Sequence, residues 1–184
     1  MTRKIRRAAA AIGAALALGT GSAVWAASAA SAAPAAASAL IPVCTAGDLA
    51  VWVNADAASG AAGTFYYPLE FTNTSNHTCR TWGYPGVSAT NANLHQLGDA
   101  AQRNHLYTPH WVNIGAGGTA HALLGYGDVE VSTSGCKPKT AAQLKVYPPN
   151  SRTAIDTFFA LPACTIGGSH VYLRVAVIQP GTQI

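Results

Sequence analysis

The chain has 184 residues, of which 49% are hydrophobic and 10% are charged, and its formal net charge is +4 at pH 7. This length predicts a single folded domain that is large enough for its own core. Four of the 11 Lys and Arg residues lie within the first seven positions, and the other seven balance the seven Asp and Glu residues. A neutral domain with scattered charges lacks the basic surface of a nucleic-acid-binding protein, so no nucleic-acid partner is expected.

The N-terminal segment has the pattern of a secretory signal peptide. A positive stretch at residues 2–7 is followed by an Ala-rich apolar stretch from Ala8 onward. Residues 30–32 (Ala-Ser-Ala) fit the small-residue cleavage pattern, and residues 27–29 are a second candidate site. We therefore expect a signal peptide over residues 1–32 and a secreted, extracellular protein, either released or associated with the cell wall. Ala and Gly are weak membrane formers, which disfavours an uncleaved membrane anchor, and no stable membrane insertion is expected after cleavage.

The first expected strands follow a short leader. Residues 33–43, rich in Ala, Pro and Ser, are expected to be flexible, and residues 44–184 to form the single domain. Apolar and polar residues alternate over residues 48–54 and 65–72, which predicts two strands. In the second of these, Pro68 predicts an edge position or a bulge, because proline cannot donate to a strand ladder.

Further strands are expected toward the C-terminus, over residues 119–124, 144–147, 154–160 and 171–178. In the last of these, one face carries Val171, Leu173, Val175 and Val177. Short strands separated by Gly, Pro and Asn turns indicate an all-β fold, an immunoglobulin-like antiparallel β-sandwich. A small β-barrel is the alternative.

The cysteines predict how this domain is cross-linked. Four cysteines follow the signal segment: Cys44, Cys79, Cys136 and Cys164. An even number in an exported domain indicates disulfides, and four cysteines allow three pairings. In an antiparallel hairpin, opposed residue numbers have a nearly constant total, about 120 for the first predicted strand pair and about 302 for 144–147 with 154–160. The first two cysteines total 123 and the last two 300, so we predict Cys44–Cys79 and Cys136–Cys164.

No catalytic, cofactor or metal site is predicted. The cysteines form no C-x-x-C pair, which disfavours zinc. The single methionine, Met1, would be removed with the signal, which disfavours a blue-copper site with its usual axial Met. The chain also contains no Gly-x-Ser-x-Gly elbow and no evident pair of carboxylates.

The aromatic residues near the middle of the chain are the remaining candidates for a functional surface. Trp82, Tyr84, Tyr107 and Trp111 stand in loop-like sequence. Such residues either pack under long loops or remain exposed as a contact surface. Trp82, Tyr84 and Trp111 are the candidate binding face.

Two sequence blocks resemble a known family. These are Cys79 with the Gly-Tyr-Pro-Gly-Val run at 83–87, and the Leu-Lys-Val-Tyr-Pro-Pro-Asn run at 144–150. They resemble the exported actinobacterial family catalogued as domain of unknown function 4232, over Cys44 to about Gln179. The resemblance implies secretion or an envelope location and a β-sandwich-like domain, and it carries over no catalytic or binding residue.

These observations together give a functional expectation. We expect a secreted or cell-envelope-associated, non-enzymatic binding module that needs no cofactor and acts as a monomer on an envelope or secreted partner. The alternative is a secreted hydrolase that acts on envelope carbohydrate or ester.

Overall fold

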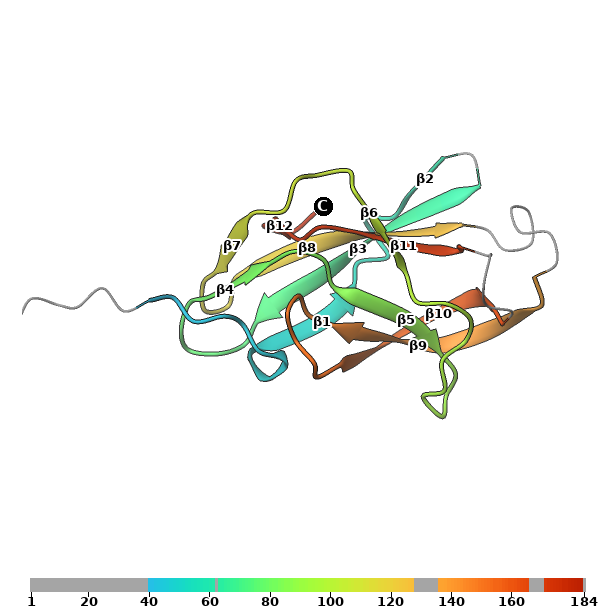
Figure 1. The fold of residues 1–184 in the computed structure, drawn as a ribbon, viewed down its shortest axis with the longest axis horizontal. Coiled ribbons are helices and arrows are strands. Elements are labelled where there is room, and N and C mark those ends of the chain that lie inside the picture. The colour runs from blue at the N-terminus through green and yellow to red at the C-terminus, as the bar shows by residue number, and fades with distance from the viewer. Residues whose placement is uncertain (1–39, 62, 128–135, 166–170, 184) are drawn as a thin grey trace, which may run out of the picture. The chain divides into compact units, whose positions relative to one another are not determined.

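The computed structural model describes residues 40–61, 63–127, 136–165 and 171–183 (Figure 1). The expected signal peptide and residues 33–39 of the expected leader lie outside the described residues. Among the residues described, no helix is long and apolar enough to cross a membrane.

The described chain is built from strands and one short 3-10 helix. Its elements in chain order are η1 (Ala46–Asp48), β1 (Leu49–Val53), β2 (Ser59–Ala61), β3 (Thr64–Asn73), β4 (Cys79–Trp82), β5 (Gly86–Thr90), β6 (Gln102–Asn104), β7 (Trp111–Ile114), β8 (Thr119–Gly127), β9 (Pro138–Tyr147), β10 (Ile155–Cys164), β11 (Leu173–Ala176) and β12 (Gln179–Pro180). The strands predicted from alternation correspond to β1, β3, β8, β9, β10 and β11. The other strands are short, and the sequence did not predict them.

The strands form two facing layers and a small third sheet. The large sheet has the order β1-β3-β8-β11-β6, with β2 added to β3 and β12 to β8. The second sheet has the order β10-β9-β5, and β4 pairs with β7 alone. Figure 1 shows the second sheet lying across one face of the large sheet. The described sheets do not close into a barrel, so the expected immunoglobulin-like antiparallel β-sandwich is confirmed, with the parallel β6–β11 pair as its exception.

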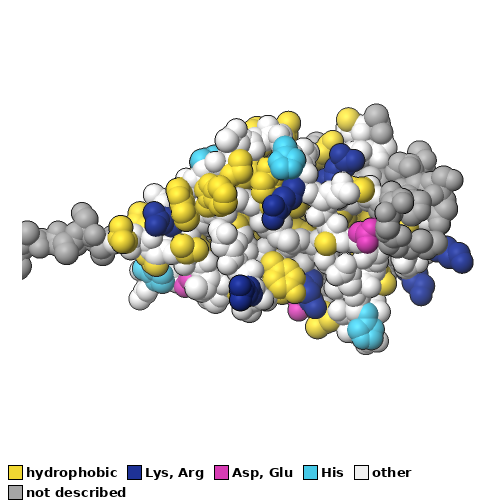
Figure 2. All heavy atoms as spheres, viewed as in Figure 1, with side chains coloured by type: hydrophobic (Ala, Val, Ile, Leu, Met, Phe, Trp, Pro, Cys, Tyr) yellow, Lys and Arg dark blue, Asp and Glu magenta, His cyan; other side chains and the backbone are white. Residues whose placement is uncertain are grey.

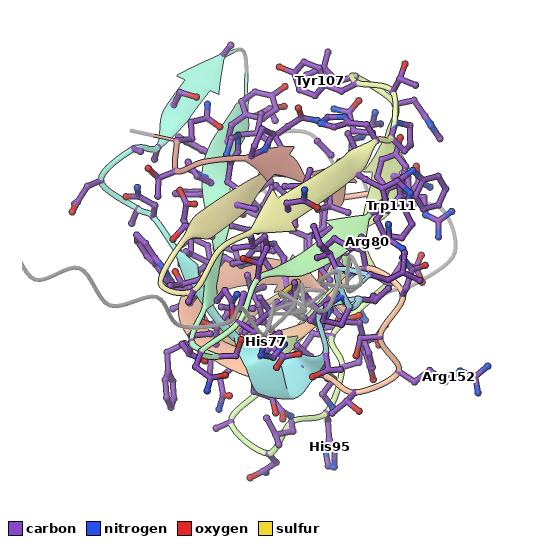
Figure 3. The ribbon with its side chains drawn as sticks, turned by 90° about the vertical axis from the view of Figure 1, so that its left-hand side faces the viewer. His77, Arg80, His95, Tyr107, Trp111 and Arg152 are labelled. Carbon is purple, nitrogen blue, oxygen red and sulfur yellow. A yellow bond between two sulfur atoms is a disulfide. The ribbon has the colours of Figure 1, made fainter. Side chains whose placement is uncertain are left out.

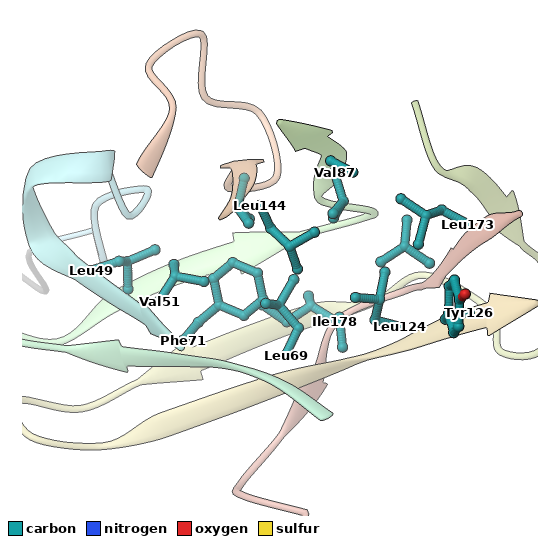
Figure 4. Packing of buried hydrophobic residues seen from close by; sticks show 14 of the residues in the cluster. Leu49, Val51, Leu69, Phe71, Val87, Leu124, Tyr126, Leu144, Leu173 and Ile178 are labelled. Carbon is teal, nitrogen blue, oxygen red and sulfur yellow. The ribbon is translucent and has the colours of Figure 1, made fainter. Parts of the chain in front are cut away.

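The core fills the space between the two layers (Figure 4). Leu69 and Phe71 of β3 and Leu124 of β8 have no exposed surface, and neither has Leu144 of β9. Successive side chains of a strand point to opposite faces, so each strand contributes alternate residues to this interior. Burial of these large side chains is the main force that holds the layers together.

Both predicted disulfides are present, Cys44–Cys79 and Cys136–Cys164. The two hairpins also have the expected register. Leu49 lies opposite Asn73, and Ile155 lies opposite Val146, so opposed residue numbers total 122 and 301. Alternation and cysteine spacing were therefore sufficient to place each disulfide beside its own pair of strands.

The chain just before Cys44 is fixed to β4. The Arg80 N–H donates to the Pro42 carbonyl at 2.8 Å, and the Cys44 N–H donates to the Arg80 carbonyl at 2.8 Å. Val43 thereby makes a parallel bridge with Arg80. Pro42 and Val43, the last two residues of the expected leader (33–43), are therefore paired with β4.

Pro68 lies in the interior of the large sheet, opposite Leu123 of β8. On its other side, β1 ends at Val53 and β2 begins to pair only at Tyr66. The Pro68 carbonyl accepts from the Asn54 N–H at 2.8 Å. The nitrogen and carbonyl of one strand residue point the same way, so the missing N–H of Pro68 faces the gap between β1 and β2. Pro68 was expected at a sheet edge or in a bulge; it lies instead where β3 has no paired strand between the end of β1 and the start of β2.

The last predicted strand, residues 171–178, is regular only over β11, which ends at Ala176. Both β11 and β12 pair antiparallel with β8, and the register shifts by one residue between them. The Ile178 N–H donates to the Gly83 carbonyl at 3.0 Å. Ala176, Val177 and Ile178 are all buried. Alternation of buried and exposed residues therefore fails in this segment, because both of its faces are covered.

Candidate binding face

The small β4–β7 sheet positions the two candidate tryptophans side by side. Trp82 and Trp111 are directly opposed in the antiparallel register. Thr81 and Val112, the neighbours in sequence, are buried beneath them. Because side chains alternate across a strand, the tryptophans must point outward. Trp82 is 43% exposed and Trp111 is 50% exposed.

Arg80 lies on the same outward face as the tryptophans. Its Cζ atom lies 4.3 Å from the centroid of the Trp111 ring. A guanidinium at this distance over an indole is attracted by the negative face of the ring, a cation–π interaction. Figure 3 shows Arg80 and Trp111 close together on one side of the molecule, away from His95 and Arg152.

Tyr84 extends this surface beyond the end of β4. Gly83, between Trp82 and Tyr84, has a φ of 101°, a left-handed conformation that glycine adopts without strain. The Tyr84 hydroxyl and Nδ1 of His105 are hydrogen-bonded at 3.1 Å, and the two rings meet edge-on. Arg103 of β6 places its Cζ atom 5.5 Å from the Tyr84 ring centroid. Arg103 and Tyr84 therefore form a second arginine–aromatic pair, beside that of Arg80 and Trp111.

A small pocket joins the two halves of this surface. It has a volume of about 170 Å³ and is lined by Trp82, Gly83, Tyr84, Arg103, Pro109 and Asn150. The Asn150 side chain donates from Nδ2 to the Trp82 carbonyl at 2.9 Å, which holds the β9–β10 connection against β4. We call the set Arg80, Trp82, Tyr84, Arg103 and Trp111 the aromatic–arginine face.

The arginines of this face have no acidic partner among the described residues. The salt bridge among these residues joins Nε2 of His77, when it is protonated, to Oδ1 of Asp48 at 4.0 Å and involves neither arginine. Nε of Arg80 is buried and makes no hydrogen bond to described residues. In the view of Figure 2, hydrophobic and cationic side chains gather over β4 and β7, and the acidic side chains in view lie away from them. The face therefore combines the exposed rings of Trp82 and Trp111 with two arginines that have no acidic partner among the described residues.

Asp48, the acidic member of that ion pair, is bound locally. Its Oδ2 atom accepts from the Thr45 hydroxyl at 2.7 Å and from the Thr45 N–H at 2.8 Å. These two hydrogen bonds hold the pKa of Asp48 below its usual range. This carboxylate therefore stabilises the turn at η1.

A second hollow lies on the outer face of the large sheet. Its volume is about 500 Å³, and its lining includes Tyr107, His121, Pro180 and Gln183. His121 donates from Nδ1 to the Gly181 carbonyl at 2.8 Å. Beneath the same segment, Glu70 is fully buried and its Oε1 accepts from the Gln183 N–H at 3.1 Å. Burial raises the pKa of Glu70.

Other polar residues give no sign of a metal centre. Within the described ranges, no group of three or more His, Cys, Asp or Glu side chains is placed to hold a metal ion. Asn73 is buried, and its Nδ2 donates to the His77 and Ile114 carbonyls at 2.8 and 2.9 Å. It therefore fixes the connection after β3.

The structure brings together the three residues of the expected binding face and separates Tyr107 from them. Trp82, Tyr84 and Trp111 share one surface, whereas Tyr107 lines the hollow on the large sheet. Sequence reasoning missed Arg80 and Arg103. The pattern Arg-x-Trp at 80–82 could have indicated one of them, because residues two apart in a strand share a face.

A family model described as Domain of unknown function (DUF4232) matches residues 44–178. The chain belongs to this family. The DUF4232 match begins at the first disulfide cysteine and includes all four cysteines and every residue of the aromatic–arginine face. Comparisons with curated proteins and with solved structures give no match. Membership of the DUF4232 family therefore accompanies the fold and assigns no activity.

Proposed function

We propose that this domain is a secreted or envelope-associated, non-enzymatic module that binds a glycan through the aromatic–arginine face. The observation that carries the proposal is the opposed Trp82–Trp111 pair, which leaves about half of each large side chain exposed. Exposed aromatic side chains that gather on one face mark interaction surfaces, because removal of their apolar area from water by a partner is favourable in free energy.

The shape of the face suits an extended ligand. The pocket of about 170 Å³ is smaller than the roughly 300–1,000 Å³ cavities that enclose small molecules. A polymer can lie across the rings and place a single substituent in this pocket. The C–H faces of sugar rings pack flat on indole and phenol rings, while their hydroxyls remain available to Asn150 and to water. A glycan chain therefore matches both the exposed rings of the surface and its mixed polarity.

The disulfides support the proposed location. Both cysteine pairs are oxidised, and stable disulfides are typical of proteins outside the cytosol. Envelope and extracellular glycans are accessible to a protein in that compartment.

The test is binding of the mature domain to a panel of soluble polysaccharides, measured by affinity electrophoresis and calorimetry. W82A and W111A should each weaken binding to a retained polysaccharide at least tenfold. W52A is the matched control, because Trp52 is similarly exposed, at 42%, but lies on β1 of the large sheet. Equal affinity of all variants would contradict the proposed face. Release of reducing ends from the polysaccharide would instead support the hydrolase alternative.

A further inference from the structure

We propose that the glycan bound by the aromatic–arginine face is negatively charged, and that its acidic groups bind Arg80 and Arg103. This inference rests on the proposed function and adds the chemical class of the ligand. It is carried by two arginines that lie against the rings of exposed Trp111 and half-buried Tyr84 and have no acidic partner among the described residues.

The first step is the geometry of the guanidinium groups. Arg80 lies over the Trp111 ring, with 4.3 Å between Cζ and the centroid, and Arg103 lies 5.5 Å from the Tyr84 centroid. A planar guanidinium that is held against a ring still has N–H groups along its edge. These edges match the paired oxygens of carboxylate, phosphate and sulfate groups, which arginine binds with two parallel hydrogen bonds. The rings thus hold the arginines in place for an anion.

The second step is the local balance of charge. The predicted mature domain has equal numbers of cations and anions, yet the aromatic–arginine face contains two arginines and no Asp or Glu. A protein without net charge exerts little long-range attraction, so a ligand is attracted here by this local patch. Such attraction is screened at ordinary salt concentrations, because the Debye length is about 8 Å at 0.15 M ionic strength.

The third step is the arrangement along the face. The Arg80–Trp111 pair stands on one side of Trp82, and the Arg103–Tyr84 pair lies across the small pocket that Trp82 helps to line. Each arginine is therefore adjacent to a ring, and the two units are separated by a third ring. A polymer whose sugar units carry acidic groups can stack its rings and pair its charges at the same time.

A lipid membrane is the other partner with anionic groups and apolar surface, and the face suits it less well. Entry of Trp111 into lipid would also take the Arg80 guanidinium out of water, which is costly for a charged group. Asn113, directly opposite Arg80 in β7, and Asn150 beside Trp82 add further polar groups to the contact surface. The same atoms can remain hydrated against a polysaccharide.

The experiment compares two polymers with one backbone. The probes are polygalacturonate, which carries a carboxylate on every sugar, and its methyl-esterified form, in which the charge is removed. We expect the mature wild-type domain to bind polygalacturonate at least tenfold more tightly than the ester, and to lose most of this preference at 0.5 M NaCl. R80Q and R103Q should each reduce the preference severalfold. K139Q, which removes an exposed cation at the start of β9, should leave it unchanged.

Each outcome distinguishes the ligand class from the proposed function. Equal, Trp82-dependent binding of both polymers would overturn the charge inference and leave the glycan proposal standing. Loss of the preference in K139Q as well as in R80Q would overturn the assignment to this face. Binding to vesicles of anionic phospholipid without binding to polygalacturonate would overturn the inference in favour of a membrane. Circular dichroism and a thiol assay on each variant exclude unfolding as the cause of lost binding.

Discussion

At the scale of single residues, Glu70 is the side chain whose burial has the clearest energetic consequence. Its Oε1 atom accepts one hydrogen bond from Gln183, and its Oε2 atom is buried without a hydrogen-bond partner among the described residues. A carboxylate in this setting loses hydration that one hydrogen bond does not replace. The neighbouring titratable group is His121, directly opposite in β8. Burial outweighs this neighbour and raises the pKa of Glu70.

The raised pKa predicts how stability depends on pH. The folded state binds the Glu70 proton more tightly than the unfolded state, so stability falls as pH rises from the ordinary carboxyl range through the raised pKa, and it is constant above. Glu70→Gln imitates the protonated form and should remove this fall. We expect E70Q to be more stable than wild type at pH 7 and to differ little near pH 4. Thermal unfolding between pH 4 and pH 8 measures this.

The control for this prediction is D156N, because Asp156 is an exposed carboxylate on β10. An E70Q variant that is less stable than wild type at pH 7 and keeps the wild-type pH dependence would contradict the prediction. His121 is present in wild type and in both variants.

At the scale of elements, the short β4–β7 pair depends on the disulfide next to it. Four residues in each strand form a two-stranded sheet, and such a ribbon is marginally stable alone. Cys79 begins β4, and Cys44 is bonded both to Cys79 and, through its N–H, to the Arg80 carbonyl. The Cys44–Cys79 disulfide therefore supports the element that carries Arg80 and Trp82.

Removal of either disulfide should lower the free energy of unfolding by a similar amount, but the two should differ in their effect on local amide hydrogen exchange. The cysteine separations are 35 and 28 residues, for which the chain-entropy model gives about 3–4 kcal/mol in each case. We expect C44A/C79A to speed amide hydrogen exchange in β4 and β7. C136A/C164A should speed exchange there less, because that disulfide joins the start of β9 to the end of β10 and does not hold β4–β7 against local opening. Faster exchange in β4 and β7 in both variants alike would contradict this assignment.

The strand pairs differ in how much the sequence could predict. The β1–β3 and β9–β10 pairs have clear signals, since each joins an alternating segment to the next and has cysteines at its end. β4 and β7 are only four residues long, and the exposed Trp82 and Trp111 make their apolar pattern ambiguous. The parallel β6–β11 pair joins Arg103 to Val175 across many residues. No local pattern in either segment encodes such a distant partner.

The candidate face could be predicted only in part for the same reason. Trp82, Tyr84 and Trp111 were recognisable by residue type, because large aromatics in polar segments are unusual. Arg103 reaches Tyr84 through the pairing of β6 with β11, which the sequence does not encode locally. The burial of Glu70 has no local signal in the sequence, because its cover comes from Gln183, 113 residues further along the chain.

At the scale of the whole molecule, the sandwich core and the aromatic–arginine face lie on opposite sides of the β4–β7 sheet. The side chains beneath Trp82 and Trp111 include Thr81 and Val112, which are almost fully buried. Val112 and Ile114 belong to the same buried cluster as Leu144 and Phe71. The position of the outer rings therefore depends on packing that continues through to the second sheet.

This continuity predicts a single cooperative unfolding transition. Leu144→Ala removes a side chain with no exposed surface at the centre of the second sheet, and comparable truncations cost about 2–5 kcal/mol. Phe158→Ala, the control, removes a large apolar side chain that is 85% exposed on β10 and should change stability by less than about 0.5 kcal/mol.

In L144A, tryptophan fluorescence reports in part on Trp82 and Trp111, and far-UV circular dichroism reports on all strands. The two denaturation curves should shift together, because a two-state domain gives the same midpoint with every probe. A fluorescence midpoint left at the wild-type value would mean that the β4–β7 sheet folds independently of the sandwich, in which case the face would not depend on the core.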